Sequence, residues 1–174
     1  MQQIARRLMT AAVLLVACSG PVWCQTLPPP ARVADLSGPR FGGTFLSTGV
    51  VDKLRTADRI NVAPMISQFG WQVEKQFYNG GSGVAALTEA VVLVGGLDQG
   101  YVLPSLSWLV GVRTHEGTEF GIGPNITPVG IGLALAAGKT FRAGVLNVPV
   151  NVAVVPSKSG VRVSMLTGFS LRRP

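Results

Sequence analysis

The feature of this 174-residue chain that most restricts its fold is a two-residue hydrophobic alternation, which recurs in short runs from about residue 40 onward. In the run 145–155, aliphatic side chains from Leu146 to Val154 alternate with a second set that includes Asn147 and Asn151. Successive side chains of a β-strand point to opposite faces of its sheet, so this period predicts strands rather than helices. A helical period of comparable length is not found.

Eight strands are predicted on this basis, and each is bounded by glycine, proline, asparagine or another turn residue. Their ranges are 40–48, 63–77, 84–95, 101–113, 117–125, 129–141, 145–155 and 160–171. Between the first two, residues 50–59 are expected to form one or two helical turns. Most of the links are short and contain glycine, as in Asn79-Gly80-Gly81 and Lys158-Ser159-Gly160.

Short links join antiparallel neighbours, whereas parallel strands need crossover connections of a dozen residues or more. The predicted fold is therefore all-β, an antiparallel up-and-down barrel of about eight strands. A barrel of that size has an interior that side chains just fill.

The composition is unusually poor in charge. Asp, Glu, Lys and Arg make up 13% of the chain, against about 25% in soluble domains. Hydrophobic residues make up 47%, and the mean hydropathy is +0.40. Much of the folded surface should therefore be apolar. The net charge is +7, but the basic residues are dispersed, so a nucleic-acid interface is not expected.

The N-terminus has the pattern of an export signal, predicted over residues 1–24. Arg6 and Arg7 precede the apolar stretch 8–17, which is too short to span a bilayer as a helix. Cys18 ends a Leu-Val-Ala-Cys sequence typical of a lipidation site, whereas the alternative is cleavage after Cys24, which would leave a mature chain without cysteine. Residues 25–38, with three consecutive prolines, are predicted to be a linker, and 39–174 the barrel domain.

Alternation defines two faces of the sheet without saying which face is inside. A membrane barrel turns aliphatic side chains toward lipid, whereas a soluble carrier barrel turns them inward around a ligand. The second face is rich in Gly and Ala and carries most of the few charges of the strands, which favours the membrane arrangement. We therefore expect a polar network in the lumen, which includes Glu74, Glu89, Glu119, Arg162, Asn147 and Asn151, and which Arg40 or Arg113 could join. Aromatic side chains near strand ends are candidates for interfacial girdles; they are Phe77, Tyr78, Tyr101, Phe141 and Phe169.

On this pattern, and on segments such as 117–125 and 147–157, the chain resembles small bacterial outer membrane β-barrel proteins of the eight-stranded type. The resemblance implies a monomer in the outer membrane, with membrane lipid and the outer membrane assembly machinery as partners. Such proteins usually end in an aromatic residue, whereas this chain ends in Leu171-Arg172-Arg173-Pro174. Phe169 is the nearest aromatic side chain.

Chemistry-bearing motifs are sparse, and no catalytic site, metal site or cofactor is predicted. His115 is the one histidine, and Ser105, Ser107, Glu116 and Glu119 lie near it in sequence. Some membrane barrels hydrolyse lipid A with His, Ser and a carboxylate, but their His-x-Ser spacing is absent here. The expected function is a non-enzymatic role in envelope structure, adhesion or narrow transport. The alternatives are a periplasmic or lipid-anchored barrel that binds an apolar ligand, and a lipid-modifying hydrolase.

Overall fold

The computed structural model describes residues 36–57, 59–80 and 83–171. Two described helices accompany the strands, α2 (Thr48–Ala57) and the 3-10 helix η1 (Leu97–Gln99). The strands are β1 (Gly38–Leu46), β2 (Met65–Gly80), β3 (Val84–Gly95), β4 (Leu103–Thr114), β5 (Thr118–Thr127), β6 (Gly130–Ala143), β7 (Leu146–Ser157), β8 (Gly160–Gly168) and the two-residue β9 (Ser170–Leu171). The predicted signal peptide with Cys18, and almost all of the predicted linker, lie outside the described residues.

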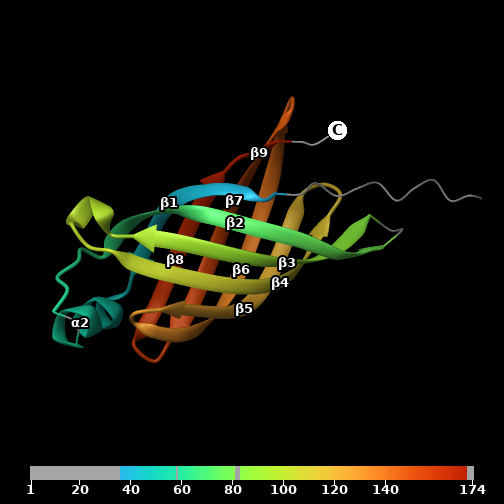
Figure 1. Cartoon of the computed structure of the whole chain (residues 1–174). Helices are drawn as coiled ribbons and strands as arrows, with labels where there is room; N and C mark the ends of the chain where they lie inside the picture. The colour runs from blue at the N-terminus through green and yellow to red at the C-terminus, as the bar shows by residue number, and fades with distance from the viewer. Residues whose placement is uncertain (1–35, 58, 81–82, 172–174) are drawn as a thin grey trace, which may run out of the picture.

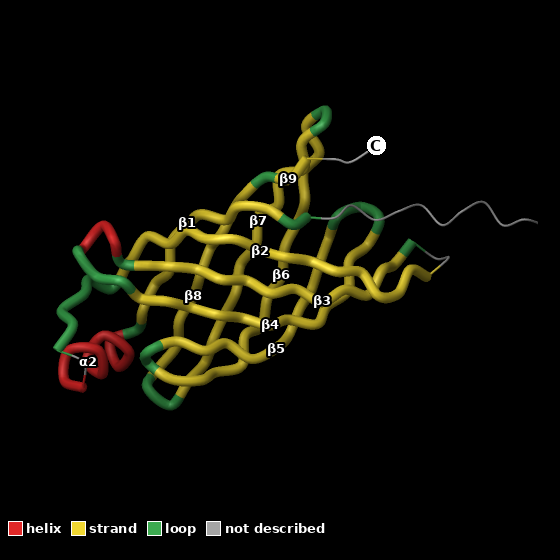
Figure 2. Tube along the Cα trace, viewed as in Figure 1, coloured by secondary structure: helices red, strands yellow, loops and turns green. Residues whose placement is uncertain are grey.

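The eight long strands close into a barrel, which confirms the predicted fold class. Each strand pairs antiparallel with its neighbour in sequence, and β1 also pairs with β8, so the sheet has no free long edge (Figures 1 and 2). Following the register once around the barrel returns to β1 with a stagger of about ten residues, which tilts the strands against the axis. After Phe169, β9 continues the line of β8 and pairs with β7.

The two ends of the barrel differ. The plugged end carries α2, η1 and the β5–β6 and β7–β8 turns, and the terminal end carries the start of β1, β9 and the other three turns (Figure 1). Three apolar side chains of α2, Val50, Val51 and Leu54, are buried over the barrel mouth. They form the plug together with Leu46, Val62, Ile66, Leu103 and Val129.

Helix α2 is longer than the one or two turns predicted. Its ten residues make about three turns, and the buried face of the helix packs on the rim of the barrel. Tyr101 also departs from its prediction, because it packs against the plug and its hydroxyl accepts a hydrogen bond from the Asn61 amide. It is therefore not a girdle residue. None of the described helices has the length and apolar composition needed to cross a membrane.

The aliphatic face of the strands points outward. Side chains on this face are about half exposed, such as Val92 (53%), Leu135 (48%) and Val152 (43%). The alternate side chains are buried in the lumen, where Val91 is 7% exposed and Val155 is 6% exposed. Phe77, Tyr78, Phe141 and Phe169 are exposed toward the terminal end. The barrel therefore has an apolar exterior.

Inward-facing glycines let neighbouring strands approach closely. A Cβ placed on Gly123 of β5 would lie 1.8 Å from the carbonyl oxygen of Trp108 on β4. On Gly121, two residues earlier and on the same face, the nearest atom to such a Cβ is Leu109 Cβ at 3.6 Å, an ordinary contact. Of these two glycines, therefore, only Gly123 is required by packing.

Gly123→Ala should lower the free energy of unfolding by about 2–3 kcal/mol, because the backbone of β4 must shift to admit the methyl group. Gly121→Ala is the matched control and should change it by less than about 0.5 kcal/mol. Urea unfolding in detergent micelles measures both. Equal losses for the two variants would contradict the close approach of β4 and β5.

Candidate functional site in the barrel lumen

The polar side chains of the lumen form two layers. The first lies toward the terminal end and centres on Arg113, which is 1% exposed. The second lies between that cluster and the plug, and surrounds a cavity of about 90 Å³. A buried water needs roughly 10–15 Å³, so the cavity has room for several waters. It is too small to serve as an open path for solutes through the barrel.

Arg113 is bound by three buried glutamates from three different strands. Its Nε donates to Glu119 Oε2 at 2.8 Å, and its Nη1 donates to Glu74 Oε1 at 2.5 Å. Its Nη2 also contacts Glu74 Oε2, lies 2.6 Å from Glu119 Oε2, and lies 3.4 Å from Glu89 Oε1. We call these four residues the Arg113 cluster.

Strand register explains why the cluster forms. Glu74 of β2 and Glu89 of β3 are directly opposite each other, and so are Arg113 of β4 and Glu119 of β5. Two like charges opposite each other on one face destabilise a sheet unless a counter-ion compensates them. Arg113 supplies that compensation from the next strand, and its planar guanidinium can serve several carboxylate oxygens at once.

Two further polar residues, Asn151 and Arg40, lie in the lumen, and only the first is bonded to the cluster. Asn151 of β7 donates from Nδ2 to Glu119 Oε1 at 2.6 Å, across Gly138, where an added Cβ would lie 2.5 Å from the Asn151 Oδ1. Arg40, 2% exposed, donates instead to neutral oxygens, to Gln72 Oε1 at 3.0 Å and to the Leu36 carbonyl at 2.5 Å. With Asn151, the cluster links side chains of β2, β3, β4, β5 and β7 within the lumen.

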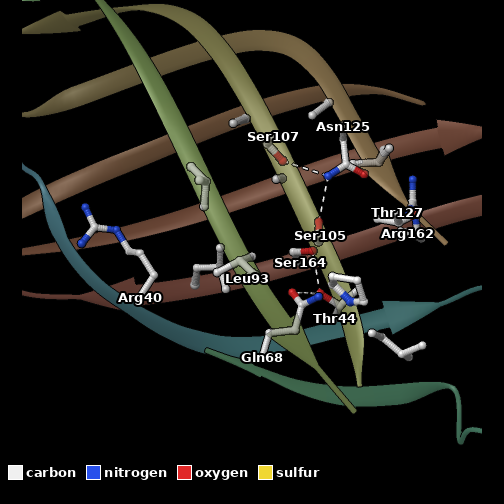
Figure 3. A pocket seen from close by; sticks show the side chains of 18 of the residues that line it. Arg40, Thr44, Gln68, Leu93, Ser105, Ser107, Asn125, Thr127, Arg162 and Ser164 are labelled. Carbon is white, nitrogen blue, oxygen red and sulfur yellow. Dashed lines mark hydrogen bonds between the residues drawn. The ribbon is translucent and has the colours of Figure 1, made fainter. Parts of the chain in front are cut away.

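The second layer consists of short polar side chains (Figure 3). Thr44 Oγ1 donates to Gln68 Oε1 at 2.6 Å and shares a hydrogen bond with Ser164 Oγ. Asn125 Nδ2 donates to the hydroxyls of Ser105 and Ser107. Arg40 and Arg162 lie on opposite sides of this view.

The structure brings four of the six predicted network residues together, namely Glu74, Glu89, Glu119 and Asn151. Arg162 is not among the partners of the Arg113 cluster, and donates instead to Thr127 near the plugged end. Asn147 is buried toward the terminal end, opposite Arg142, and its side-chain oxygen and nitrogen have no hydrogen-bond partner. The sequence analysis named Arg113 only as a possible member, whereas the structure makes it the centre.

The residues considered for hydrolysis do not assemble. His115 lies in the β4–β5 turn at the terminal end, while Ser105 and Ser107 lie eight or more residues away along β4, more than about 20 Å at 3.3 Å per residue. Glu119 is engaged by Arg113 and Asn151. Among the described residues, no group of His, Cys, Asp and Glu side chains is arranged to hold a metal ion.

Arg113→Met should lower the free energy of unfolding by about 3–5 kcal/mol, because three buried carboxylates lose their shared counter-ion. The control is Arg142→Met, which removes an exposed arginine at the same end of the barrel whose Nη2 donates to the His115 carbonyl. We expect it to cost less than about 0.5 kcal/mol. A loss for Arg113→Met no larger than the control's would show that the cluster does not stabilise the fold.

Comparison with known protein families, curated proteins and solved structures finds no significant similarity to the chain. The closed eight-stranded antiparallel barrel is evident from its own strand pairing. Its function therefore has to be inferred from the chemistry of its outer wall and its lumen.

Proposed function

We propose that this protein is a transmembrane β-barrel of a bacterial outer membrane, and that it acts as a sealed envelope protein rather than as an open pore. The observation that carries the proposal is the composition of the outer wall. In the described strands, the exposed charged residues are Lys75, Lys139 and Arg142 alone, and all three lie toward the terminal end. The other outward positions hold aliphatic, aromatic, small or hydroxyl-bearing residues.

Several polar groups of this wall are bonded to the protein itself. The indole nitrogen of Trp108 donates to Thr88 Oγ1 at 2.8 Å, and that hydroxyl donates to the Leu109 carbonyl. The Thr167 hydroxyl donates to the Pro149 carbonyl at 3.1 Å. A surface in water has no need of such internal bonds, whereas in hydrocarbon an unsatisfied polar group costs several kcal/mol.

The height of the uncharged band fits a bilayer. Met65 and Lys75 are ten residues apart on β2, about 33 Å along the strand at ~3.3 Å per residue. A strand tilt of about 40° reduces this to about 25 Å along the barrel axis, which is the height of the apolar band of transmembrane barrels. The exposed Phe77, Tyr78 and Phe141 lie beyond the band, where aromatic girdles are expected.

The lengths of the connections favour one orientation. The connection from β1 to β2 runs through α2 at the plugged end, whereas the turns of the terminal end are short. Transmembrane barrels have short periplasmic turns and longer extracellular loops. We therefore infer that the plugged end faces outward from the cell and that the start of β1 and the end of β8 face the periplasm.

The lumen supports a structural role for the barrel. The plug covers one mouth, and the Arg113 cluster crosses the lumen toward the other. A carrier for an apolar ligand would need its aliphatic side chains around an internal cavity, but here they face outward and the cavity measures about 90 Å³. An envelope role therefore accounts for more of the observations than free diffusion or ligand transport.

Substitutions at two depths test the lipid-facing wall. Leu135 lies midway along β6 between Ile131 and Lys139, all on the outward face. In lipid vesicles Leu135→Arg should cost about 2–4 kcal/mol of folding free energy, whereas Ile131→Arg, near the end of the strand, should cost at most about 1 kcal/mol. If both arginines were equally harmless, the outer wall would be facing water.

Cell fractionation tests the location. The protein should remain in the outer membrane fraction after high-salt and carbonate washes, dissolve only in detergent, and migrate differently on gels before and after boiling. Planar bilayers containing it should show no steady conductance. Release of a water-soluble barrel by salt would contradict the proposed location, and a steady open channel would contradict a sealed lumen.

A further inference from the structure

Arg162 is a buried cation that forms no ion pair with any carboxylate in the described part of the chain. It is 6% exposed and lies near the start of β8, where it lines the lumen cavity. The described carboxylates that form ion pairs with arginine all do so with Arg113 rather than with Arg162. Its hydrogen bond goes to the Thr127 hydroxyl, which in turn donates to the Gly130 carbonyl. The Nε of Arg162 has no hydrogen-bond partner.

Burial of an unpaired charge is costly, and proteins normally compensate it with a partner charge or with further hydrogen bonds. The contrast within this lumen is direct. Arg113 is bound by three glutamates, and Arg40 donates all three of its nitrogens to carbonyl or amide oxygens. Arg162 forms an ion pair with none of the described carboxylates and makes one hydrogen bond, to the Thr127 hydroxyl, although it faces a cavity of about 90 Å³.

The cavity that Arg162 lines also has hydroxyl groups in its wall. Hydroxyls of Ser105, Ser107 and Ser164 line it. Ser164 already donates to Thr44, whereas Ser105 and Ser107 accept hydrogen bonds from Asn125, which leaves their protons free to be donated. Glu89 is the one acidic residue in the described lining, and its carboxylate lies beside Arg113. The charge of Arg162 and these hydroxyl donors therefore favour the binding of an anion in the cavity.

Another part of the wall is apolar, and it includes plug residues such as Leu54, Leu103 and Val129, together with Val155. Val155 is the direct cross-strand partner of Arg162. A ligand that fits this wall carries its charge at one end and a short hydrocarbon part at the other. Since a cavity of about 150 Å³ holds the six carbons of benzene, this one should hold about four heavy atoms.

We propose that the lumen cavity is a binding site for a small monocarboxylate of the size of acetate. The carboxylate accepts hydrogen bonds from Arg162 Nε and from the neighbouring hydroxyls, and the methyl group packs against the underside of the plug. Trapped water alone and a bound inorganic anion such as chloride are the competing occupants.

Equilibrium dialysis with radiolabelled acetate tests the site directly. The whole chain is refolded from urea into detergent micelles in the presence of acetate, so that no entry route through the folded barrel is required. We expect saturable binding that approaches one acetate per barrel. Arg162→Met should weaken the affinity at least tenfold, because a charge-assisted hydrogen bond is lost. Arg142→Met, which removes an exposed arginine outside the cavity, should bind acetate as the unmodified chain does.

Three results would overturn the proposal. Absence of saturable binding to the folded chain would mean that trapped water alone surrounds Arg162. If Arg162→Met bound acetate as tightly as the unmodified chain does, this arginine would not be a ligand of the acetate. A gain of tenfold or more in acetate affinity when chloride in the buffer is replaced by gluconate would assign the site to an inorganic anion.

A second variant keeps the test decisive if Arg162→Met fails to fold, which heat-dependent gel migration reveals. Ala134→Leu leaves the arginine in place and fills the cavity, because Ala134 is buried, lines the cavity and packs against Val155. It should weaken acetate binding at least tenfold. Unchanged affinity in this variant would show that acetate binds elsewhere.

Discussion

Pairing between the first and last long strands is the constraint on which the rest of this molecule depends. When β1 pairs with β8, the hydrogen-bond ladder closes on itself and no long strand keeps a row of unpaired amides and carbonyls. A closed ladder allows the outer wall to be apolar, because the backbone no longer needs water. It also creates an enclosed lumen, which can hold the polar side chains excluded from the wall.

The enclosed lumen then sets its own requirements. Eight strands leave an interior that side chains fill, so the charges inside must be matched over short distances. The Arg113 cluster matches them by placing one guanidinium among three carboxylates from β2, β3 and β5. Toward the plugged end, α2 supplies the apolar side chains that cover the mouth. Ion pairs thus stabilise the lumen toward the terminal end, and hydrophobic packing stabilises it at the plugged end.

Much of the fold follows from local patterns in the sequence. Alternation and glycine turns are properties of neighbouring residues, so the eight strands were predictable within a few residues of their observed bounds. The Arg113–Glu119 pair could also have been predicted from the sequence, because a tight hairpin turn at 115–117 places residues 113 and 119 opposite each other. Helix α2 was predicted too short, since its length depends on packing over a barrel mouth that only the closed fold provides.

The rest depends on long-range geometry. Alternation cannot tell the inside of a barrel from its outside, and the choice requires the burial of residues such as Val91 and Val92 to be known. The separation of Arg162 from Glu74 likewise follows from the stagger of the strands around the barrel, which no local pattern contains. Tyr101 illustrates the same limit, because an aromatic residue beside a strand end suits a girdle and a plug equally well.

The central claim is that the apolar exterior faces hydrocarbon, and lipid-attached nitroxides test it most directly. In bilayer nanodiscs that contain doxyl-labelled lipid, the NMR signals of the Val92 methyl groups should be strongly broadened. Those of Val91, one residue earlier but inside the lumen, should persist. Equal persistence of both signals, or broadening of Val91 alone, would contradict the account.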